Sequence, residues 1–299
     1  MFKCGFISIN GKANVGKSTL TNRLVGEKVS IVSWKAHTTR DNILGIVNGD
    51  DYQAIFIDTP GLHTAKNKLD SYMMKSARTA MKDVDVLLYV IDSQARPDPY
   101  DKEFVEMHAN KEYPLIVVLN KDDVAGPEKI LSQIDRLKDI EGIKAIVPIS
   151  AIKGDGIDEL LHEIVKYLPE GDPLYDRDEV SDKDLAYMMR EIVREKTLRL
   201  LDKEVPYGIG VSLQKFRKRE NQDIYDIEGT IYCEKENHKG IIIGKNGSML
   251  KKISTYSRQD IEDMLGTKVY LKLWVKVKPD WREDVATLEK LGYSNKSNE

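Results

Sequence analysis

The chain has 299 residues, more than the roughly 100 to 200 residues of a typical single domain, so two domains with separate cores are expected. Hydrophobic residues make up 41% and charged residues 32%, which is typical of a globular protein, and the longest apolar run, VLLYVI at 86–91, is too short to cross a membrane. The two cysteines are too few for a disulfide framework, and the first residues lack the basic-then-apolar pattern of a signal peptide. We therefore expect a cytoplasmic protein.

The net charge of −3 is distributed unevenly along the chain. Residues 1–172 contain 22 Lys or Arg and 26 Asp or Glu, whereas residues 239–278 contain nine basic and three acidic side chains. A local basic excess attracts polyanions, but an ordinary solvated face can have the same composition. Charge alone favours the solvated face.

Short apolar runs alternate with amphipathic segments in the first part of the chain. The helical segments lie at 69–83 and 128–140, and the apolar runs at 6–9, 54–57, 86–91, 115–119 and 145–149 are predicted to be buried strands. This alternation is typical of a largely parallel sheet covered by helices on both faces. Ligands of such sheets bind beyond the carboxyl ends of the strands.

A Pro-, Gly- and acid-rich stretch around 169–182 is predicted to be a linker, so the expected domains are 1–170 and 183–299, joined by 171–182. The second domain has a different order of elements. It starts with a helix at 185–201 and continues with strands at 207–216 and 223–235, a glycine turn, a helix to about 265, a strand at 268–277 and a helix near 280.

The sequence GKANVGKS at 11–18 matches the phosphate-loop pattern G-x-x-x-x-G-K-S. It follows a predicted strand and opens a helix, so its backbone N–H groups and the helix N-terminus can surround phosphate oxygens. We expect Lys17 to reach the β- and γ-phosphates and Ser18 to bind Mg²⁺.

Two further motifs follow that bear on the phosphates. DTPG at 58–61 ends a predicted strand, where Asp58 can hold Mg²⁺ through water and Gly61 can offer its N–H to the γ-phosphate. In WKAHTTRDN at 34–42, Thr39 is the candidate second Mg²⁺ ligand, and Thr38 is the competing assignment.

The motif NKDD at 120–123 matches N-K-x-D and predicts which base is bound. The Asp123 carboxylate can accept from guanine N1–H and the exocyclic amine, whereas adenine has neither donor there. SAIKG follows the last strand, and its Ser150 and Ala151 can offer a backbone N–H to guanine O6. The sequence therefore predicts a GTP site.

These assignments make up the predicted nucleotide site. The nucleotide-binding residues are Gly11, Asn14, Val15, Gly16, Lys17, Ser18, Thr19, Asp58, Gly61, Asn120, Lys121, Asp123, Ser150 and Ala151; the catalytic set is Lys17, Thr39, Gly61 and Asn14; and the metal ligands are Ser18, Thr39 and Asp58.

The first domain resembles the translation-factor-related branch of P-loop GTPases, but Leu62 stands where Ras-like proteins have a water-orienting glutamine. Asn14 offers an alternative, because its amide oxygen could reach a monovalent cation against the β/γ-phosphates, under backbone carbonyls of 34–39. GTPases with this combination are activated by K⁺, so K⁺ is a candidate cofactor beside Mg²⁺. Alternatively, the Asn14 side chain could only form a hydrogen bond with its own loop backbone.

The stretch KGIIIGKNGSMLKKI at 239–253 contains a G-x-x-G turn. No G-K-[ST] follows it and no strand ends immediately before it, so a second nucleotide loop is not expected. Alone, G-x-x-G also fits a tight turn between helices. The order helix, two strands, helix, turn, helix and strand predicts an α+β KH domain of the second type, whose loop clamps single-stranded RNA. The predicted RNA-binding residues are Ile243, Gly244, Lys245, Asn246, Gly247 and Lys251.

The motifs GKANVGKST, TTRD, DTPGLH, NKDD, SAIKG and IIGKNGSMLKKI together resemble those of the Era family of GTPases over essentially the whole chain. Lys12 and Ala13 stand where that family commonly has Arg-Pro. The resemblance implies binding to the 3′ end of small-subunit ribosomal RNA during small-subunit assembly. It also allows for peripheral contact with the inner face of the cell membrane. We expect the protein to be a monomer.

Two functions therefore compete. In the first, GTP orders segments 34–42 and 62–67, and hydrolysis releases them and changes how the KH domain is held. In the second, the protein is an RNA-binding module whose GTPase domain senses guanine nucleotide and barely hydrolyses it. A tRNA-modifying GTPase would need a further catalytic domain, of which the sequence shows no sign.

Overall fold

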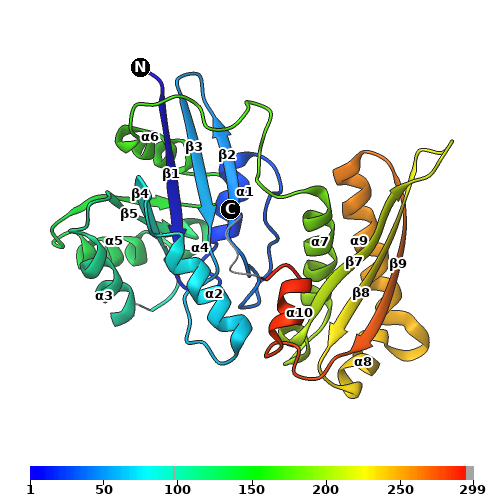
Figure 1. Ribbon diagram of the computed structural model, residues 1–299. Coiled ribbons are helices and arrows are strands. Elements are labelled where there is room, and N and C mark those ends of the chain that lie inside the picture. The colour runs from blue at the N-terminus through cyan, green and yellow to red at the C-terminus, as the bar shows by residue number, and fades with distance from the viewer. Residues whose placement is uncertain (97, 294–299) are drawn as a thin grey trace. The chain divides into compact units, whose positions relative to one another are not determined.

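The computed structural model describes residues 1–96 and 98–293, and the chain divides into two compact units (Figure 1). The first unit contains residues 1–32, 39–64 and 73–182. The second contains residue 183 onward together with two short segments, 33–38 and 65–72, from the N-terminal part of the chain. The sequence did not indicate that these two segments belong to the second unit, because that assignment depends on tertiary contacts.

The first unit is built on one sheet with strand order β2-β3-β1-β4-β5-β6. The strands are β1 (Lys3–Asn10), β2 (Ile43–Asn48), β3 (Tyr52–Asp58), β4 (Val86–Asp92), β5 (Leu115–Asn120) and β6 (Ile143–Ile149). All neighbouring pairs are parallel except β2 with β3. The predicted α/β class with a mostly parallel sheet is therefore confirmed.

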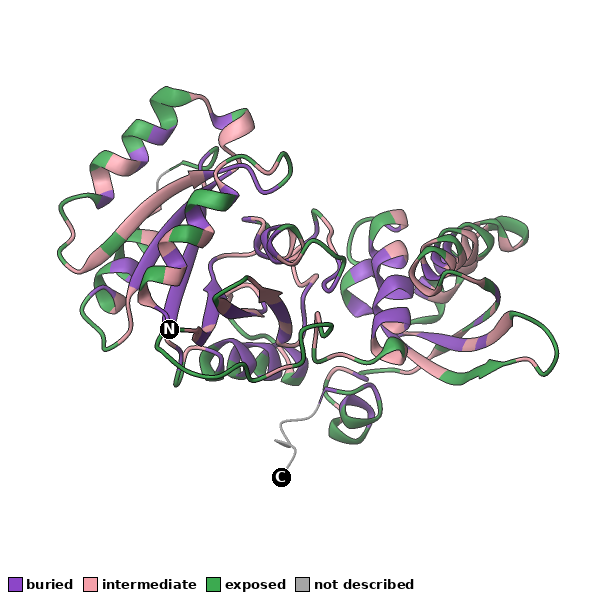
Figure 2. Ribbon diagram, turned by 90° about the horizontal axis from the view of Figure 1, so that it is seen from above, coloured by how far each residue is buried: buried purple, intermediate pink, exposed green. Residues whose placement is uncertain are grey.

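The central strands are apolar on both sides because helices cover both faces of the sheet. Leu88 and Val90 of β4 join the core under α1 (Lys17–Val25) and α6 (Ile157–Tyr167). Leu87 and Tyr89 face the other core, under α3 (Pro99–His108) and α5 (Pro127–Leu137). Figure 2 shows buried residues along these strands and exposed residues on the outer sides of the helices. This covering leaves the carboxyl ends of the strands as the place for a ligand.

The sequence did not predict strand β2, which is short and lies at the antiparallel edge of the sheet. The predicted linker 171–182 belongs to the first unit and runs beside this edge. Ile46 N donates to Val180 O at 3.0 Å, and Leu44 N donates to the Asp182 carboxylate at 2.9 Å. The linker thus satisfies N–H groups that an edge strand would otherwise leave unpaired.

The second unit has a sheet of order β7-β8-β9, in which β7 (Gly210–Lys218) is antiparallel to β8 (Ile224–Cys233) and β8 is parallel to β9 (Lys268–Val277). Its helices are α7 (Leu185–Leu200), α8 (Glu236–Ile243), α9 (Ser248–Leu265) and α10 (Val285–Lys290). Val193 of α7 and Ile253 of α9 pack on Ile231 and Leu273 of the sheet. This element order confirms the predicted type II KH domain.

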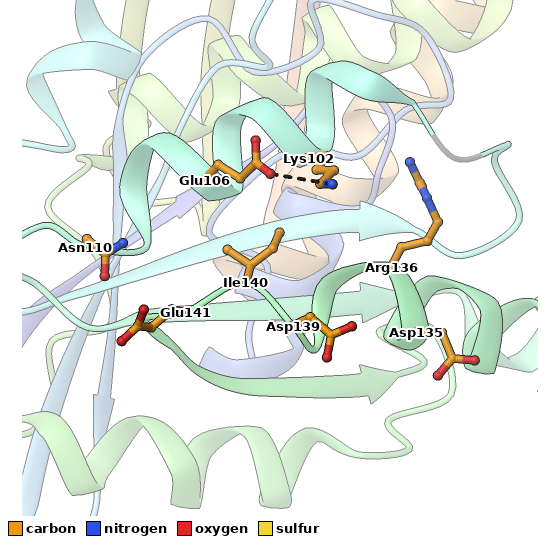
Figure 3. A pocket seen from close by; sticks show the side chains of 8 residues that line it. All are labelled: Lys102, Glu106, Asn110, Asp135, Arg136, Asp139, Ile140 and Glu141. Carbon is orange, nitrogen blue, oxygen red and sulfur yellow. Dashed lines mark ion pairs between the residues drawn. The ribbon is translucent and has the colours of Figure 1, made fainter.

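Two further features bear on the choice of site. A surface pocket between α3 and α5, lined mainly by charged residues, contains none of the predicted site residues (Figure 3). Among residues 1–96 and 98–293, every helix is too short or too polar to span a bilayer.

Candidate nucleotide and RNA sites

The phosphate loop adopts backbone conformations that favour glycine. Gly11, Asn14 and Gly16 have φ angles of 147°, 65° and 103°, and Gly16 is the N-cap of α1. A Cβ at Gly16 would lie 2.2 Å from Asn120 Nδ2, so only glycine allows this close approach. The loop N–H groups and the start of α1 can therefore surround an anion.

Lys17 lies buried inside this loop. Its Nζ donates to the carbonyl oxygens of Gly11 at 3.0 Å and Lys12 at 2.8 Å. Burial lowers the pKa of Lys17 to about 8, and the nearby charge of Asp58 acts in the opposite direction. An ammonium held in this way is a strong partner for phosphate oxygens, which would restore its preference for the charged form.

Asn120 connects two loops at the carboxyl edge of the sheet. Its Nδ2 donates to Val15 O at 2.8 Å, and its Oδ1 accepts from Ala151 N at 3.0 Å. The side chain is 2% exposed, so both bonds are shielded from water. Asn120 thus sets the distance between the phosphate loop and the SAIKG segment rather than lying open to a ligand.

The base-recognition residues also lie together. Ser150 Oγ donates to Asp123 Oδ1 at 2.8 Å, and Ser150 itself is fully buried. Lys121 adopts the left-handed conformation with φ 70° just before α4 (Asp122–Ala125), and its Nζ pairs with Asp92 at 2.6 Å. These contacts fix the Asp123 carboxylate while leaving it half-buried and able to accept from a base.

The candidate metal ligands converge beside the loop. Ser18 Oγ and Thr39 Oγ1 are 2.8 Å apart, whereas the Thr38 hydroxyl donates to Lys35 O at 2.6 Å. Asp58 is fully buried, and its Oδ2 accepts from Ser30 Oγ at 2.7 Å.

The second carboxylate oxygen of Asp58 shows why a cation fits here. Asp58 Oδ1 has no hydrogen-bond partner among the residues that the structure describes. Burial raises the pKa of Asp58, with the nearby hydroxyl groups of Ser18 and Ser30 and the charge of Lys17 acting against that shift. A buried, unpaired oxygen beside two hydroxyl groups is a donor set of the hard kind that Mg²⁺ prefers.

The DTPG turn packs directly on the phosphate loop. A Cβ at Gly61 would lie 2.8 Å from the Cα of Ala13, and Leu62 N donates to Gly11 O at 3.2 Å. The Leu62 side chain packs against the core under α3 and α5 and offers no polar group. Asn14 is exposed, and its amide makes no hydrogen bond within the described part of the chain.

Segment 33–38, which joins the second unit, is held by α7 and the residue that follows it. Lys35 Nζ donates to Leu201 O, and the Arg194 guanidinium donates to Thr38 O and pairs with Glu191. Arg194 is 1% exposed. Burial acts to lower the pKa of Arg194, but the Glu191 carboxylate outweighs this and raises it above its ordinary value.

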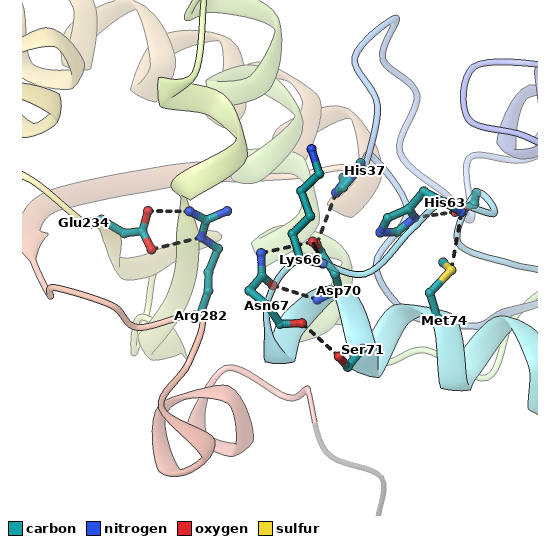
Figure 4. A network of polar contacts seen from close by, with 10 residues as sticks. His37, His63, Lys66, Asn67, Asp70, Ser71, Met74, Glu234 and Arg282 are labelled. Atoms are coloured by element: carbon teal, nitrogen blue, oxygen red, sulfur yellow. Dashed lines mark hydrogen bonds and ion pairs between the residues drawn. The ribbon is translucent and has the colours of Figure 1, made fainter.

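Segment 65–72 is organised around Asp70 (Figure 4). The Asp70 carboxylate accepts from Lys66 N at 3.0 Å and Asn67 Nδ2 at 3.1 Å, and it pairs with His37 at 3.4 Å. Leu69 N donates to Arg282 O at 3.2 Å. Both segments that flank the nucleotide motifs are therefore integrated into the second unit.

Sequence reasoning missed these anchoring residues. Arg194 lies among Ile192, Val193 and Leu198 in the apolar stripe of α7, with Glu191 three residues earlier. A charged pair inside an apolar stripe is the signal that could have drawn attention to them. Their partner, the carbonyl of Thr38, cannot be read from a sequence.

The G-x-x-G turn lies between α8 and α9, with φ angles of 72°, 52° and 77° at Gly244, Asn246 and Gly247. A Cβ at Gly244 would lie 2.8 Å from Met249 N, whereas a Cβ at Gly247 would meet no described atom within 4 Å. Lys245 and Asn246 are exposed. The open side of the turn is therefore at Gly247.

The remaining predicted RNA-binding residues flank this turn. Lys251 is exposed on the first turns of α9, and Ile243 is half-buried at the end of α8. Between these positions in the chain, Ile242 is fully buried in the core, whereas Ile241 is 47% exposed.

The fold and these sites define a P-loop GTPase domain followed by a KH domain. Family models agree: "50S ribosome-binding GTPase" matches residues 6–121, and "KH domain" matches residues 204–282. GTPase Era of Clostridium kluyveri is 48% identical over 98% of this chain and 100% of its own length, and that of Clostridium botulinum strain Hall is 49% identical over 99% of both. The chain belongs to the Era family and is a GTPase.

Solved structures of the family agree with this fold over nearly the full chain. Era in complex with MgGDPNP and nucleotides 1506–1542 of 16S ribosomal RNA is 43% identical, with a TM-score of 0.94 over 98% of this chain and 100% of that one. A variant of Aquifex aeolicus Era bound to GDP and aluminium fluoride is also 43% identical, with a TM-score of 0.93 over the same shares.

The lowered pKa of Lys17 predicts that nucleotide affinity depends on pH. Phosphate oxygens favour the charged ammonium, so binding above the pKa of about 8 requires Lys17 to take up a proton. GTP affinity should be constant below this pKa and fall as the pH rises through it, by up to about tenfold per pH unit. The measurement is the GTP dissociation constant from about pH 6.5 to about pH 9.5.

Lys17→Arg is the matched control, because a guanidinium stays charged over this whole range. Its affinity should be weaker but should lose the dependence on pH. The same decline with pH in both proteins would show that another group titrates.

Proposed function

We propose that this GTPase is a molecular switch that binds the 3′ end of small-subunit ribosomal RNA through its KH domain and assists small-subunit assembly. The observation that carries the proposal is the open G-x-x-G turn between two helices, with exposed Lys245 and Asn246 at its tip. KH loops of this kind clamp the backbone of about four single-stranded nucleotides. The relative solved with a 16S ribosomal RNA segment supports the same class of ligand here.

The nucleotide site supports binding of GTP and GDP. Lys17 would contact the β- and γ-phosphates, the Gly61 N–H would contact the γ-phosphate, and Asp123 would accept from guanine. Ser18, Thr39 and Asp58 would hold Mg²⁺, which when bound neutralises charge on the phosphate oxygens. Thr39 is preferred to Thr38 because its hydroxyl lies beside Ser18.

The setting of this activity follows from the same proposal. An RNA-binding assembly factor acts in the cytoplasm, and the family resemblance makes a monomer the expected state. Peripheral contact with the inner face of the cell membrane is part of the proposal only as a secondary association.

A second candidate is an RNA-binding module that senses guanine nucleotide and barely hydrolyses it. It is favoured by Leu62, which offers no polar group to hold an attacking water. A single-turnover GTP hydrolysis assay with and without the ribosomal RNA 3′ end separates the two. A rate that RNA changes supports the switch, whereas negligible hydrolysis in both conditions supports the sensor.

The contact between Arg194 and Thr38 O supports the switch and gives it a route. Thr38 belongs to the RNA-binding unit, and the next residue, Thr39, lies beside Ser18 in the GTPase unit. One peptide thus joins a buried KH-domain arginine to a candidate metal ligand. We infer that this peptide is the route by which a change at the KH domain would be felt at Thr39.

Arg194→Lys tests this route. Lysine keeps a positive charge beside Glu191 but lacks the forked donors that reach both partners, so Thr38 should be released. We expect the rate change caused by RNA to fall several-fold while RNA affinity without nucleotide stays within about twofold. Arg190→Lys, one turn earlier and stacked on Tyr187 at 4.9 Å, is the control and should keep the full RNA effect. A full RNA effect in Arg194→Lys would contradict the route.

Gly247→Asp tests the RNA site more cleanly than a change at Gly244, where the backbone of Met249 leaves no room. At Gly247 a side chain enters open space, so the added carboxylate should repel the RNA backbone and lower affinity at least tenfold. Gly247→Asn is nearly identical in shape, is neutral and tolerates positive φ. It should lose clearly less affinity; equal losses would mean that shape or strain, and not charge, is responsible.

Asn14 is the candidate ligand for K⁺, since its exposed amide has no partner in the described chain. A cation there would act like an arginine finger, which is worth roughly 10³ to 10⁵ in rate. We expect several-fold faster hydrolysis in K⁺ than in Na⁺ at equal ionic strength, and no such difference in Asn14→Ala. Equal rates in both salts for the parent protein would place the missing group on a partner.

A further inference from the structure

The edge strand β9 presents a regular row of basic and aromatic side chains. Its inward residues, Val269, Leu271 and Leu273, pack in the core under the helices. Since side chains of a strand alternate, the intervening residues point to the opposite, outer face of the sheet. That row, here called the β9 row, consists of Lys268, Tyr270, Lys272, Trp274 and Lys276.

The two aromatic residues of this row are both exposed on the outer face. Tyr270 is 54% exposed and Trp274 is 37% exposed. Lys272 Nζ lies 4.8 Å from the centre of the Trp274 ring, and the Arg219 guanidinium lies 5.6 Å from that of Tyr270. A cation therefore lies over each ring, and both residues keep a substantial exposed surface.

The lysines of the β9 row form no close ion pairs with the described residues, although the Glu262 carboxylate interacts electrostatically with Lys268. In residues 1–96 and 98–293, none of its three lysines has a carboxylate within ion-pair distance. The two acids on the adjacent strand are engaged elsewhere, Asp226 with Arg219 at 2.7 Å and Glu228 with Lys215 at 3.7 Å. The row is thus a strip of available cations.

We propose that the β9 row is a second RNA-binding surface, which takes single-stranded RNA continuing from the segment clamped by the G-x-x-G turn. Successive lysines of the row are four residues apart and therefore about 13 Å apart on the strand, a spacing suited to alternate phosphates of an extended RNA strand. Aromatic rings between them can stack on bases without regard to sequence. This inference extends the RNA-binding role proposed above and rests on it.

The position of β9 supports a continuous path. It is the outer strand of the sheet, and both α8 and α9, which flank the G-x-x-G turn, pack against it. These helices cover the inner face of β9, so RNA leaving the turn would reach the β9 row on the outer face by passing around this edge of the sheet. Trp281 and Leu291 cover the outer face at Gly210 of β7, which is level with Lys276 two strands away, whereas Lys276 itself is exposed.

An anionic membrane is the other polyanion that lysines and aromatic residues could contact. Asp226 and Glu228 lie directly opposite Tyr270 and Lys272 in the middle of the same face. Carboxylates there would oppose insertion of the rings into an anionic lipid surface, whereas RNA can place phosphates over the lysines and bases over the rings. The observations therefore favour RNA.

The test uses the full-length protein and two RNAs, a short strand that fills only the G-x-x-G turn and the same strand extended by about eight nucleotides. The variant is Lys268→Gln, Lys272→Gln and Lys276→Gln combined. Its affinity for the extended RNA should fall at least tenfold, and the slope of log affinity against log salt should lose about 2, since each phosphate contact contributes about 0.7. Affinity for the short RNA should stay within about twofold.

The matched control is the combination of Lys102→Gln, Lys111→Gln and Lys129→Gln, which removes the same charge from the first unit and should change neither affinity. Trp274→Leu is a second variant and should lower affinity for the extended RNA alone. If the triple variant fails to fold, a photoreactive base is placed in the RNA extension and crosslinked to the unmodified protein with ultraviolet light. Crosslinks within residues 268–276 support the β9 row, and their absence contradicts it.

The outcomes separate this inference from the RNA site on which it rests. Unchanged affinity of the triple variant for the extended RNA, or an equal loss for both RNAs, overturns the β9 row as a second surface. Loss of binding to phosphatidylserine vesicles with RNA binding intact overturns it in favour of a membrane contact. Failure of the unmodified protein to bind even the short RNA would instead refute the G-x-x-G site.

Discussion

The side chain of Asn120 is the contact on which the nucleotide site depends. It accepts from Ala151 N and donates to Val15 O, so one buried amide holds the phosphate loop against the SAIKG segment. These segments are far apart in sequence and meet only because parallel strands bring their carboxyl ends to one edge. The missing Cβ of Gly16 is what lets the amide approach. The sheet therefore brings the phosphate loop and the SAIKG segment to the same edge, and the Asn120 side chain fixes the distance between them.

Burial of opposite charges prepares the same edge for a phosphorylated ligand. Burial lowers the pKa of Lys17 and raises that of Asp58, because each charged form loses solvation. Neither group is fully compensated by the protein, and Asp58 Oδ1 has no partner in the described residues. Phosphates and a divalent cation would satisfy both at once. The buried charges of Lys17 and Asp58 are thus unfavourable without a ligand, and phosphate and cation binding would stabilise them.

The second unit includes two short segments from the N-terminal part of the chain. Segments 33–38 and 65–72 follow the phosphate loop and the DTPG turn in the chain, yet they pack with the KH domain. Arg194 is buried and ion-paired, so its bond to Thr38 O is shielded from water and costly to break. This bond ends at the residue directly before Thr39, the candidate metal ligand. The conformation of the G-x-x-G turn, by contrast, depends on local glycines.

The sequence by itself determined the fold class, the type II KH order and which residues have the chemistry for GTP, because these follow from local patterns: apolar runs, glycine spacing and polar motifs at strand ends. The tertiary structure alone decided how they are used. It distinguished Thr39 beside Ser18 from Thr38 bonded to Lys35, put Ile242 in the core, paired the edge strand β2 with the linker and joined two segments to the KH unit. These outcomes depend on how side chains and backbone groups meet in the folded chain, mostly across long stretches of sequence, and no local sequence pattern records those contacts.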